Sequence, residues 1–311
     1  MNPARNHSRT RPRAVWFGLF VVLVLACCSA ALASTWSAEG DAEKAGGAQR
    51  AAAPLAPPAR GCDRRLQSPA FLIADARGRT LAALNAGRRR AVGSITKLMT
   101  ARLVLRAGGL GETVTVPSLR LQPDESRAGL MPGERFDRNA LLRMLLVASA
   151  NDAAETLAAT SAGGRTAFVR AMNRGARGLG LEHTRYVNPS GMPDPAQRSS
   201  ARDSVDLARV LMADARVRRI ARTRSVDAPG ADGRPLLATN TLLGRVPGVD
   251  GLKTGHVGNQ WSMVATATGP GGRIFTAVLG APSQTARDRD AHCLLSVGRR
   301  LVAPGSSRPE H

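Results

Sequence analysis

A serine and a lysine three positions apart, Ser94 and Lys97, are the first side chains in this sequence that could do chemistry together. At the start of a helix, this spacing places both side chains on one face, within reach of each other. A serine hydroxyl is a weak nucleophile until an adjacent base removes its proton. A lysine whose pKa is lowered by burial or by nearby positive charge can be that base at neutral pH. The pair therefore predicts a serine nucleophile with a lysine base.

Lysine is rare in this chain, because arginine supplies nearly all of its 44 basic residues. Lysine occurs only at positions 44, 97 and 253. Arginine does not give up its proton, whereas lysine can do so when it is buried. We therefore expect Lys97 and Lys253 to stand where a deprotonatable amine or a compact ammonium is needed.

Ser149 and Asn151 fall at a break between two apolar stretches with helical periodicity. Polar side chains at such a break can project from a turn instead of joining the core. Ser149 could pass a proton between Lys97 and a leaving group, and Asn151 could hold Lys97 and bind a substrate amide. Both residues are also of the types that cap helices, so capping is the alternative explanation.

The tripeptide Lys253-Thr254-Gly255 lies on an expected strand. Glycine leaves a strand's backbone open to close approach, so a substrate peptide could add alongside as an extra strand. Lys253 would supply positive charge for a substrate carboxylate, and Thr254 would supply a hydroxyl. The backbone N–H groups of Ser94 and His256 would receive the oxyanion of a tetrahedral intermediate. An ordinary strand end is the alternative explanation.

In this order the three motifs match the S-x-x-K, S-x-N and K-T-G signature of penicillin-binding proteins and β-lactamases. From about residue 70 to 301, the chain resembles the low-molecular-weight D-alanyl-D-alanine carboxypeptidases, which are serine peptidases that penicillin acylates. The resemblance extends to residues 131–134, 145–158, 200–203 and 251–256. It implies an α+β fold of the β-lactamase and DD-peptidase type.

The resemblance also implies a role for each site residue. It makes Ser94 the nucleophile, Lys97 its base, Ser149 and Asn151 the second motif, Lys253 to Gly255 the carboxylate-binding strand with His256 after it, and Arg202 an additional group that neutralises the carboxylate.

Two segments depart from the family pattern. Ala91-Val92-Gly93 stands where Pro-Ala usually precedes the serine, and Asn259-Gln260-Trp261 replaces an Ala-Gly pair after the third motif.

The implied activity is hydrolysis of the terminal D-Ala-D-Ala bond of peptidoglycan stem peptides through a Ser94 acyl-enzyme, with β-lactams as further ligands. A DD-transpeptidase, which accepts an amine instead of water, is the first alternative. A β-lactamase needs a water-activating carboxylate, and the glutamates between the second and third motifs, Glu155 and Glu182, lack the expected Glu-x-x-Leu-Asn setting. A non-catalytic protein that binds the cell envelope is the last alternative. No cofactor is expected, and no metal site, because CxxC and HExxH motifs are missing from the sequence.

The elements that must position these residues follow from hydrophobic periodicity. We expect a hairpin over residues 70–75 and 80–84, helices over 94–107, 137–147, 151–159, 165–177 and 201–213, strands over 249–255, 261–268 and 273–280, and a closing helix over 284–301. The order of these elements predicts an α+β fold, with an antiparallel sheet whose strands come from both ends of the chain and a mostly helical middle region.

The N-terminus has the features of a secretory signal peptide over residues 1–33: arginines, the apolar run Val15–Ala26, and small residues up to Ala33. We expect a flexible Ala- and Pro-rich stalk over 34–60, one catalytic domain over 61–303 and a disordered tail over 304–311. An uncleaved anchor and lipidation of Cys27 are alternatives to signal cleavage. In an oxidising compartment Cys62 and Cys293 could pair, although each could equally be a buried apolar residue.

The net charge of +21 indicates a polyanionic neighbour. An anionic cell envelope fits an exported chain better than nucleic acid does, because no nucleic-acid-reading motif is present. Arginines that simply form solvated faces are the alternative. The expected protein is therefore exported, periplasmic or otherwise extracytoplasmic, and monomeric.

Overall fold

A computed structural model describes residues 66–228 and 234–304. The chain divides into two units, residues 1–49 and 50–311, and all described residues belong to the second. The predicted signal peptide, the stalk, Cys27 and Cys62 lie outside the described residues.

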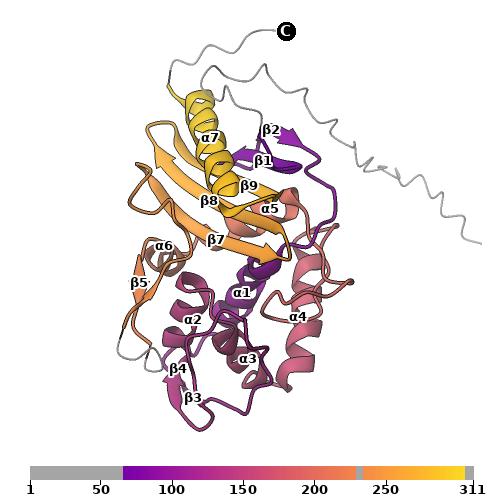
Figure 1. The fold of residues 1–311 in the computed structure, drawn as a ribbon, viewed down its shortest axis with the longest axis vertical. Helices are drawn as coiled ribbons and strands as arrows, with labels where there is room; N and C mark the ends of the chain where they lie inside the picture. Colours follow the sequence, from indigo (N-terminus) through magenta and orange to yellow (C-terminus); the bar gives the residue numbers. More distant parts are fainter. Residues whose placement is uncertain (1–65, 229–233, 305–311) are drawn as a thin grey trace, which may run out of the picture. The chain divides into compact units, whose positions relative to one another are not determined.

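The centre of the fold is a five-stranded antiparallel sheet in the order β2-β1-β9-β8-β7 (Figure 1). Its strands are β1 (Ala70–Asp75), β2 (Thr80–Leu84), β7 (Val249–Val257), β8 (Gln260–Gly269) and β9 (Gly272–Ala281). The N-terminal hairpin therefore pairs with strands from the other end of the chain. This arrangement confirms the α+β prediction and leaves β7 at an edge of the sheet.

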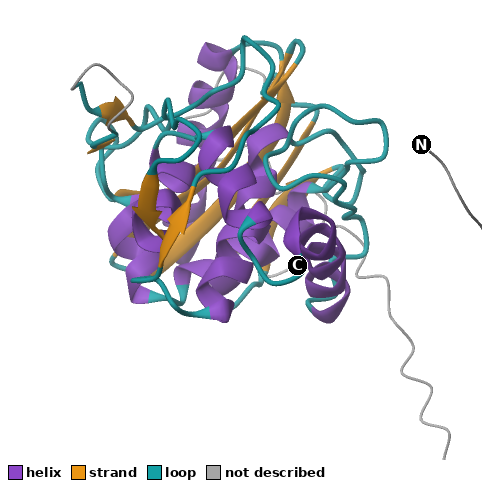
Figure 2. Cartoon of the chain, turned by 90° about the horizontal axis from the view of Figure 1, so that it is seen from below, coloured by secondary structure: helices purple, strands orange, loops and turns teal. Residues whose placement is uncertain are grey.

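Helices cover both faces of the sheet (Figure 2). Alternate residues of β1 point to opposite sides, as the pleat of a strand requires: Phe71 and Ile73 pack in a cluster with α7 (Gln284–Val302), whereas Leu72 and Ala74 belong to the larger core that includes α5 (Ala201–Met212). Strands β1, β8 and β9 each contain five or six apolar residues in a nearly continuous run. Such runs are expected because both faces of these strands are buried.

A helical region packs beside the sheet. It contains the short 3₁₀ helix η1 (Gly93–Thr96), α1 (Lys97–Ala107), α2 (Arg138–Val147), α3 (Asn151–Ala159), α4 (Gly164–Gly178) and α6 (Ala215–Ala221). Asp137 caps α2 as expected from its residue type, since its carboxylate accepts a hydrogen bond from the N–H of Ala140 at 2.6 Å. Among the described residues, none of the helices combines the length and apolarity needed to cross a bilayer.

The structure differs from the sequence prediction in short elements. Four strands and one helix were not predicted: β3 (Thr113–Thr115), β4 (Arg135–Asp137), β5 (Ser225–Val226), β6 (Leu236–Leu237) and α6. Strands of two or three residues are too short to show a hydrophobic period, so packing and not local pattern determines them. The predicted helix over 94–107 is correct in extent, but it begins with η1, so Ser94 lies in a tight 3₁₀ turn.

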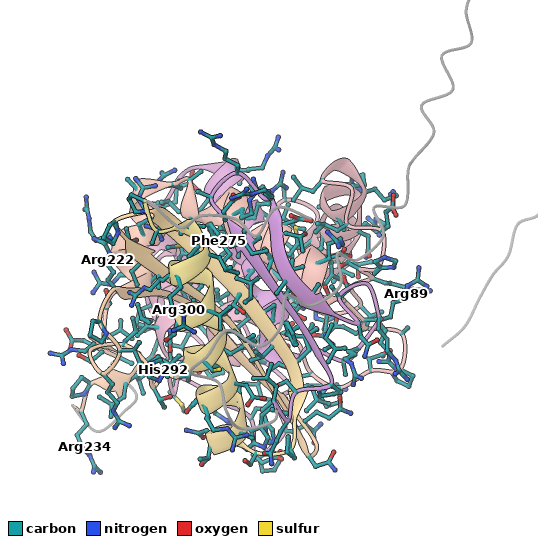
Figure 3. All side chains as sticks on the ribbon, turned by 90° about the horizontal axis from the view of Figure 1, so that it is seen from above. Arg89, Arg222, Arg234, Phe275, His292 and Arg300 are labelled. Atoms are coloured by element: carbon teal, nitrogen blue, oxygen red, sulfur yellow. The ribbon has the colours of Figure 1, made fainter. Side chains whose placement is uncertain are left out.

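Two sequence expectations concern the outside of the fold. Arginines such as Arg89, Arg222 and Arg234 project from different sides of the molecule (Figure 3). Cys293 on α7 is disulfide-bonded. The three other cysteines all lie within residues 1–65, so pairing with Cys62 stays a prediction.

Candidate active site

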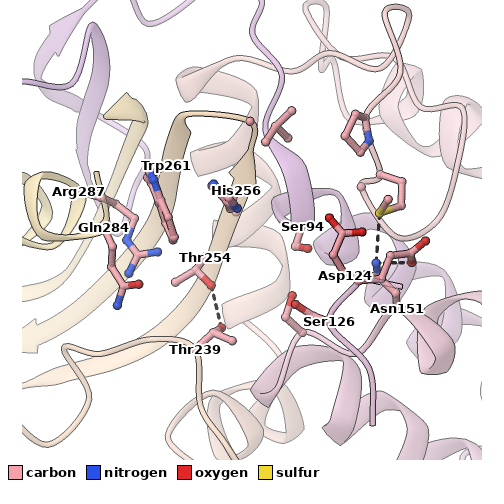
Figure 4. A pocket seen from close by; sticks show the side chains of 18 of the residues that line it. Ser94, Asp124, Ser126, Asn151, Thr239, Thr254, His256, Trp261, Gln284 and Arg287 are labelled. Atoms are coloured by element: carbon pink, nitrogen blue, oxygen red, sulfur yellow. Dashed lines mark hydrogen bonds between the residues drawn. The ribbon is translucent and has the colours of Figure 1, made fainter. Parts of the chain in front are cut away.

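The three motifs meet at a cavity of about 700 Å³. Ser94, Ser149, Asn151, Thr254, Gly255 and His256 are among the residues that line it. In Figure 4, Thr254, His256, Trp261 and Arg287 approach from the sheet and α7, while Asn151 approaches from the helical region with Ser94 between them. Segments far apart in the sequence therefore form one site.

Lys97 lies directly behind the Ser94 side chain and is fully buried. Its amine nitrogen Nζ contacts three oxygen atoms: Ser94 Oγ at 2.8 Å, Asn151 Oδ1 at 2.5 Å and the Ser190 carbonyl oxygen at 2.5 Å. The predicted contact between the serine hydroxyl and the lysine amine is thus present, and so is the predicted contact of Asn151 with Lys97.

The types of these three oxygen atoms decide what the amine can do. A neutral lysine amine has two N–H donors and one lone pair. The Asn151 and Ser190 oxygens are carbonyl oxygens, which only accept hydrogen bonds. They therefore take both N–H groups of the neutral amine and leave its lone pair facing Ser94, whose hydroxyl can donate. This is the arrangement needed to remove the proton from Ser94.

The surroundings favour the neutral amine. Burial lowers the pKa of Lys97 to about 7, and the carboxylates of Glu125, Glu155 and Asp152 partly oppose this effect. Near neutral pH a substantial fraction of Lys97 is therefore deprotonated and able to act as a base.

Ser149 occupies an unusual backbone position between α2 and α3. Its φ of 64° places it in the left-handed region, which is uncommon for a residue other than glycine. The N-cap of α3 is Ala150, and no side-chain cap bond is made there. Helix capping therefore does not explain this motif: Ser149 lines the cavity, and Asn151 uses its amide on Lys97.

Glycines bring the backbones of the site together. A Cβ atom on Gly255 of β7 would lie 2.1 Å from the carbonyl oxygen of Val92, and one on Gly191 would lie 2.1 Å from the carbonyl oxygen of Gly93. A Cβ atom on Gly93 would lie 2.7 Å from the backbone nitrogen of His256. The absence of side chains thus lets β7 approach the segment before Ser94, as an oxyanion site built from the N–H groups of Ser94 and His256 requires.

Lys253 and Thr254 point in opposite directions from β7. Thr254 lines the cavity, and its hydroxyl donates to Thr239 Oγ1 at 2.7 Å. Lys253 is fully buried behind the cavity wall, where its Nζ donates to the Thr254 carbonyl oxygen at 3.1 Å. Burial, followed by the charges of Lys97 and Arg287, holds the pKa of Lys253 well below its usual value. Lys253 is not among the residues that line the cavity, and its role in binding a substrate carboxylate stays a prediction.

The assignment of Arg202 to a carboxylate-binding role needs correction. Arg202 lies on α5, its guanidinium reaches Thr80 on β2, and it is not among the residues that line the cavity. The arginine that lines the cavity is Arg287 on α7. The resemblance to the family over residues 200–203 gave no information about the direction of the Arg202 side chain. Packing against the hairpin of β1 and β2 decides that direction.

Arg287 is almost completely buried beside two aromatic rings. Its guanidinium carbon is 5.7 Å from the centre of the Trp261 ring, and Trp261 stacks on His256 with ring centres 3.9 Å apart. Its Nε donates a hydrogen bond to Asp288 Oδ1 at 2.8 Å, and its Nη2 forms an ion pair with the same oxygen at 2.6 Å.

Several site residues were missed in the sequence. They are Glu125, Thr239, Ser190 and Arg287. Ser190 acts through its backbone carbonyl, which no side-chain motif can reveal, although it falls in the expected loop 188–195. In the sequence, Trp261 stands out only as part of a departure from the family pattern. Among the described residues there is no group of three or more His, Cys, Asp or Glu side chains that could hold a metal ion.

The sheet, the helical region beside it and the serine–lysine pair between them define the class of the penicillin-binding proteins and their serine-reactive relatives. Within that class, the chain belongs to the D-alanyl-D-alanine carboxypeptidase family, whose sequence pattern matches residues 59–283. D-alanyl-D-alanine carboxypeptidase DacF of Bacillus subtilis is 31% identical over 230 residues, which are 71% of this chain and 59% of the relative.

Solved structures agree with this assignment. Penicillin-binding protein 6B from Escherichia coli is similar with a TM-score of 0.70 and 31% identity, covering 75% of this chain and 77% of that one. Penicillin-binding protein D2 from Listeria monocytogenes in its ampicillin-bound form is similar with a TM-score of 0.68 and 29% identity, covering 76% and 98%. The chain spans about three fifths of the length of the first curated relatives that it matches.

Proposed function

We propose that this protein is a serine-type D-Ala-D-Ala carboxypeptidase that acts on peptidoglycan stem peptides through an acyl-enzyme on Ser94. The observation that carries the proposal is the set of contacts of Lys97 Nζ, which meets Ser94 Oγ and the carbonyl oxygens of Asn151 and Ser190. In the neutral amine, the two carbonyl oxygens take both N–H groups, so the lone pair is left for Ser94. Membership of the D-alanyl-D-alanine carboxypeptidase family supports the choice of substrate.

The reaction begins when Lys97 takes the hydroxyl proton of Ser94. Ser94 Oγ then attacks the carbonyl carbon of the penultimate D-alanine, and the N–H groups of Ser94 and His256 stabilise the resulting oxyanion. The C–N bond breaks as the leaving D-alanine nitrogen receives a proton from Lys97, with Ser149 as the relay. Water next attacks the ester carbonyl, Ser94 regains its proton, and the shortened peptide leaves.

The terminal carboxylate of the substrate has a place at the end of the cavity formed by the sheet and α7. Arg287 supplies a buried positive charge there, and the hydroxyls of Thr254 and Thr239 supply neutral hydrogen bonds. The free edge of β7 offers backbone groups along which an extended peptide can bind as an additional strand.

A β-lactam presents a strained amide and a carboxylate to the same groups. The ampicillin-bound form of a relative supports penicillin as a ligand of this site, and we propose that it acylates Ser94. A DD-transpeptidase, which differs only in passing the acyl group to an amine, is the second candidate. A β-lactamase is a weaker candidate, because fast deacylation needs a water-activating carboxylate in a setting that the sequence lacks. A non-catalytic envelope-binding protein is also weaker, because binding alone does not require an aligned serine and lysine.

The proposal includes export. The signal-like residues 1–33 support an extracytoplasmic or periplasmic location. The signal is either cleaved or kept, and in the second case an uncleaved or lipidated N-terminus attaches the protein to the membrane. The net charge of +21 supports contact with an anionic cell envelope. We propose a monomer as the working form.

The test is release of D-alanine from a stem-peptide mimic ending in D-Ala-D-Ala, with labelling by a fluorescent penicillin in parallel. Release together with labelling supports the carboxypeptidase. Labelling without release, followed by peptide transfer when an amine acceptor is added, favours the transpeptidase. Absence of both signals would contradict the proposed function.

The rate of penicillin acylation is expected to rise with pH through about 7 and then level off. The neutral form of Lys97 is the base, and its pKa is about 7, so the rate falls about tenfold for each pH unit below that value. The measurement is the second-order labelling rate between pH 5 and about 9, which reports the free enzyme. A rate that stays constant from acid to neutral pH would remove Lys97 from the role of base.

A further inference from the structure

Glu125 is an acidic residue in the cavity for which the three motifs provide no role. One carboxylate oxygen, Oε2, accepts a hydrogen bond from Asn151 Nδ2 at 2.7 Å. The other, Oε1, accepts from the N–H of Gln122 at 2.8 Å. The carboxylate is therefore held at both oxygens, and one of them is in contact with the residue that binds Lys97.

The segment that carries Glu125 is fastened to the start of α3. The N–H of Asn151 donates to the Ser126 carbonyl oxygen at 2.8 Å. The buried carboxylate of Asp152 accepts hydrogen bonds from the N–H groups of Ala128, Gly129 and Leu130. The position of Glu125 next to Asn151 is therefore fixed by the hydrogen bonds of the residues that follow it, Ser126 and 128–130.

The Asn151 amide can be placed in two ways, and only one of them is productive. With Nδ2 toward Glu125, Oδ1 faces Lys97 and accepts one of its N–H groups. If the amide were turned over, Nδ2 would face the lysine and donate to its lone pair, which would then be unavailable to Ser94. A carboxylate accepts hydrogen bonds but cannot donate them, so Glu125 selects the productive orientation, together with Met192 Sδ, a weaker acceptor 3.3 Å from Asn151 Nδ2.

We propose that Glu125 is a positioning residue that orients the Asn151 amide and thereby directs the lone pair of Lys97 to Ser94. This role rests on the proposed function, since it concerns the acylation of Ser94. Glu155 and Glu182 are the glutamates between the second and third motifs. Glu125 precedes the second motif and reaches the cavity through the fold.

The charge of Glu125 has a second, separable effect. Glu125, Glu155 and Asp152 face Lys97 as negative groups and raise its pKa, against the larger lowering by burial. Lys253 is the positive group on the neighbouring strand, and its own pKa is lowered in part by Lys97. Removing the Glu125 charge should therefore lower the pKa of Lys97 and move the rising limb of the acylation profile to lower pH.

Two substitutions separate orientation from charge. Glu125→Gln removes the charge, but the new side chain keeps an oxygen that can accept the hydrogen bond from Asn151 Nδ2. Its amide nitrogen then faces the backbone N–H of Gln122, which is exposed and can bind water instead. We expect its plateau acylation rate to stay within about threefold of the unmodified protein, with the rising limb lower by about 0.5–1 pH unit. Glu125→Ala removes the carboxylate acceptor as well and leaves Asn151 Nδ2 with the weak acceptor Met192 Sδ, so we expect the plateau rate to fall about 10- to 100-fold. Glu134→Gln is the matched control, since Glu134 binds Met131 N–H outside the cavity.

The measurements are the penicillin acylation rate against pH, the deacylation rate, and an NMR titration of Lys97 in the unreacted protein. With lysine only at positions 44, 97 and 253, labelled lysine gives a readily assigned spectrum. A plateau rate of Glu125→Ala equal to that of the unmodified protein would overturn the proposal. So would a Lys97 titration in Glu125→Ala equal to that of the unmodified protein, because this variant lacks both the charge and the carboxylate acceptor. A defect confined to deacylation would also overturn it, since Glu125 would then act on the hydrolytic water.

The two proposals can fail separately. If the unmodified protein forms no acyl-enzyme, the proposed function fails. The Lys97 titration does not depend on turnover, so it still decides whether Glu125 acts on the serine–lysine pair.

Discussion

Ser94→Ala is expected to abolish both the release of D-alanine and covalent labelling by penicillin, with a loss of about 10⁶-fold in the rate of acylation. The reason is chemical, because the proposed acyl-enzyme forms on Ser94 Oγ, the hydroxyl oxygen that lies 2.8 Å from the Lys97 amine. The substitution removes one oxygen atom from a turn of η1 and should leave the fold intact, which a thermal unfolding curve will verify.

Ser296→Ala provides the matched control for this loss. Ser296 lies on α7, where its hydroxyl donates to the His292 carbonyl oxygen at 3.0 Å, and it does not line the cavity. Its activity should equal that of the unmodified protein. Stoichiometric penicillin labelling of Ser94→Ala at another residue would disprove Ser94 as the nucleophile.

Lys97→Met is expected to reduce acylation by about 10⁴- to 10⁶-fold at every pH. Methionine has a similar length and keeps the buried volume filled, but it has no lone pair of comparable basicity and no N–H donor. The carbonyl oxygens of Asn151 and Ser190 then lose their shared partner, at a cost of about 1–3 kcal/mol for each. The acylation rate is read from penicillin labelling over hours, together with the unfolding temperature.

Lys97→Arg distinguishes a base from a mere positive charge. Arginine keeps N–H donors for the two carbonyl oxygens and keeps the charge, but it cannot give up its proton. We expect the arginine variant to be nearly as inactive as the methionine variant. If it retained more than about a tenth of the acylation rate, Lys97 would act through its charge alone. Lys44→Met, outside the described residues, controls for the loss of a lysine.

The sequence predicted the regular elements of this fold well where one pattern persists over a whole element. The hairpin strands Ala70–Asp75 and Thr80–Leu84 and the helix Asn151–Ala159 have the predicted bounds. A strand or helix of several residues that is buried on one side shows a repeating pattern of apolar residues in the sequence itself. The missed strands β3 to β6 are too short for that, and they form only because neighbouring segments supply their partners.

Within the site, the sequence by itself determined the residue types: a serine and a lysine at helical spacing, the Ser149 and Asn151 pair, and the tripeptide at 253–255. These are local features, and their spacing follows from backbone geometry within one element. The sequence could not determine whether Lys253 faces the cavity, whether Arg202 or Arg287 lines it, or which glutamate reaches Asn151. Those outcomes depend on how β7, α5, α7 and the 122–130 segment pack.

Only the tertiary structure decided the chemistry of Lys97. A lysine becomes a base when water is excluded and when its N–H groups are taken by acceptors that leave the lone pair free. The burial and the carbonyl oxygens that accomplish this come from η1, α3 and the loop at Ser190, which the chain brings together from distant positions. Desolvation and hydrogen-bond direction are properties of that three-dimensional environment, and no spacing along the sequence encodes them.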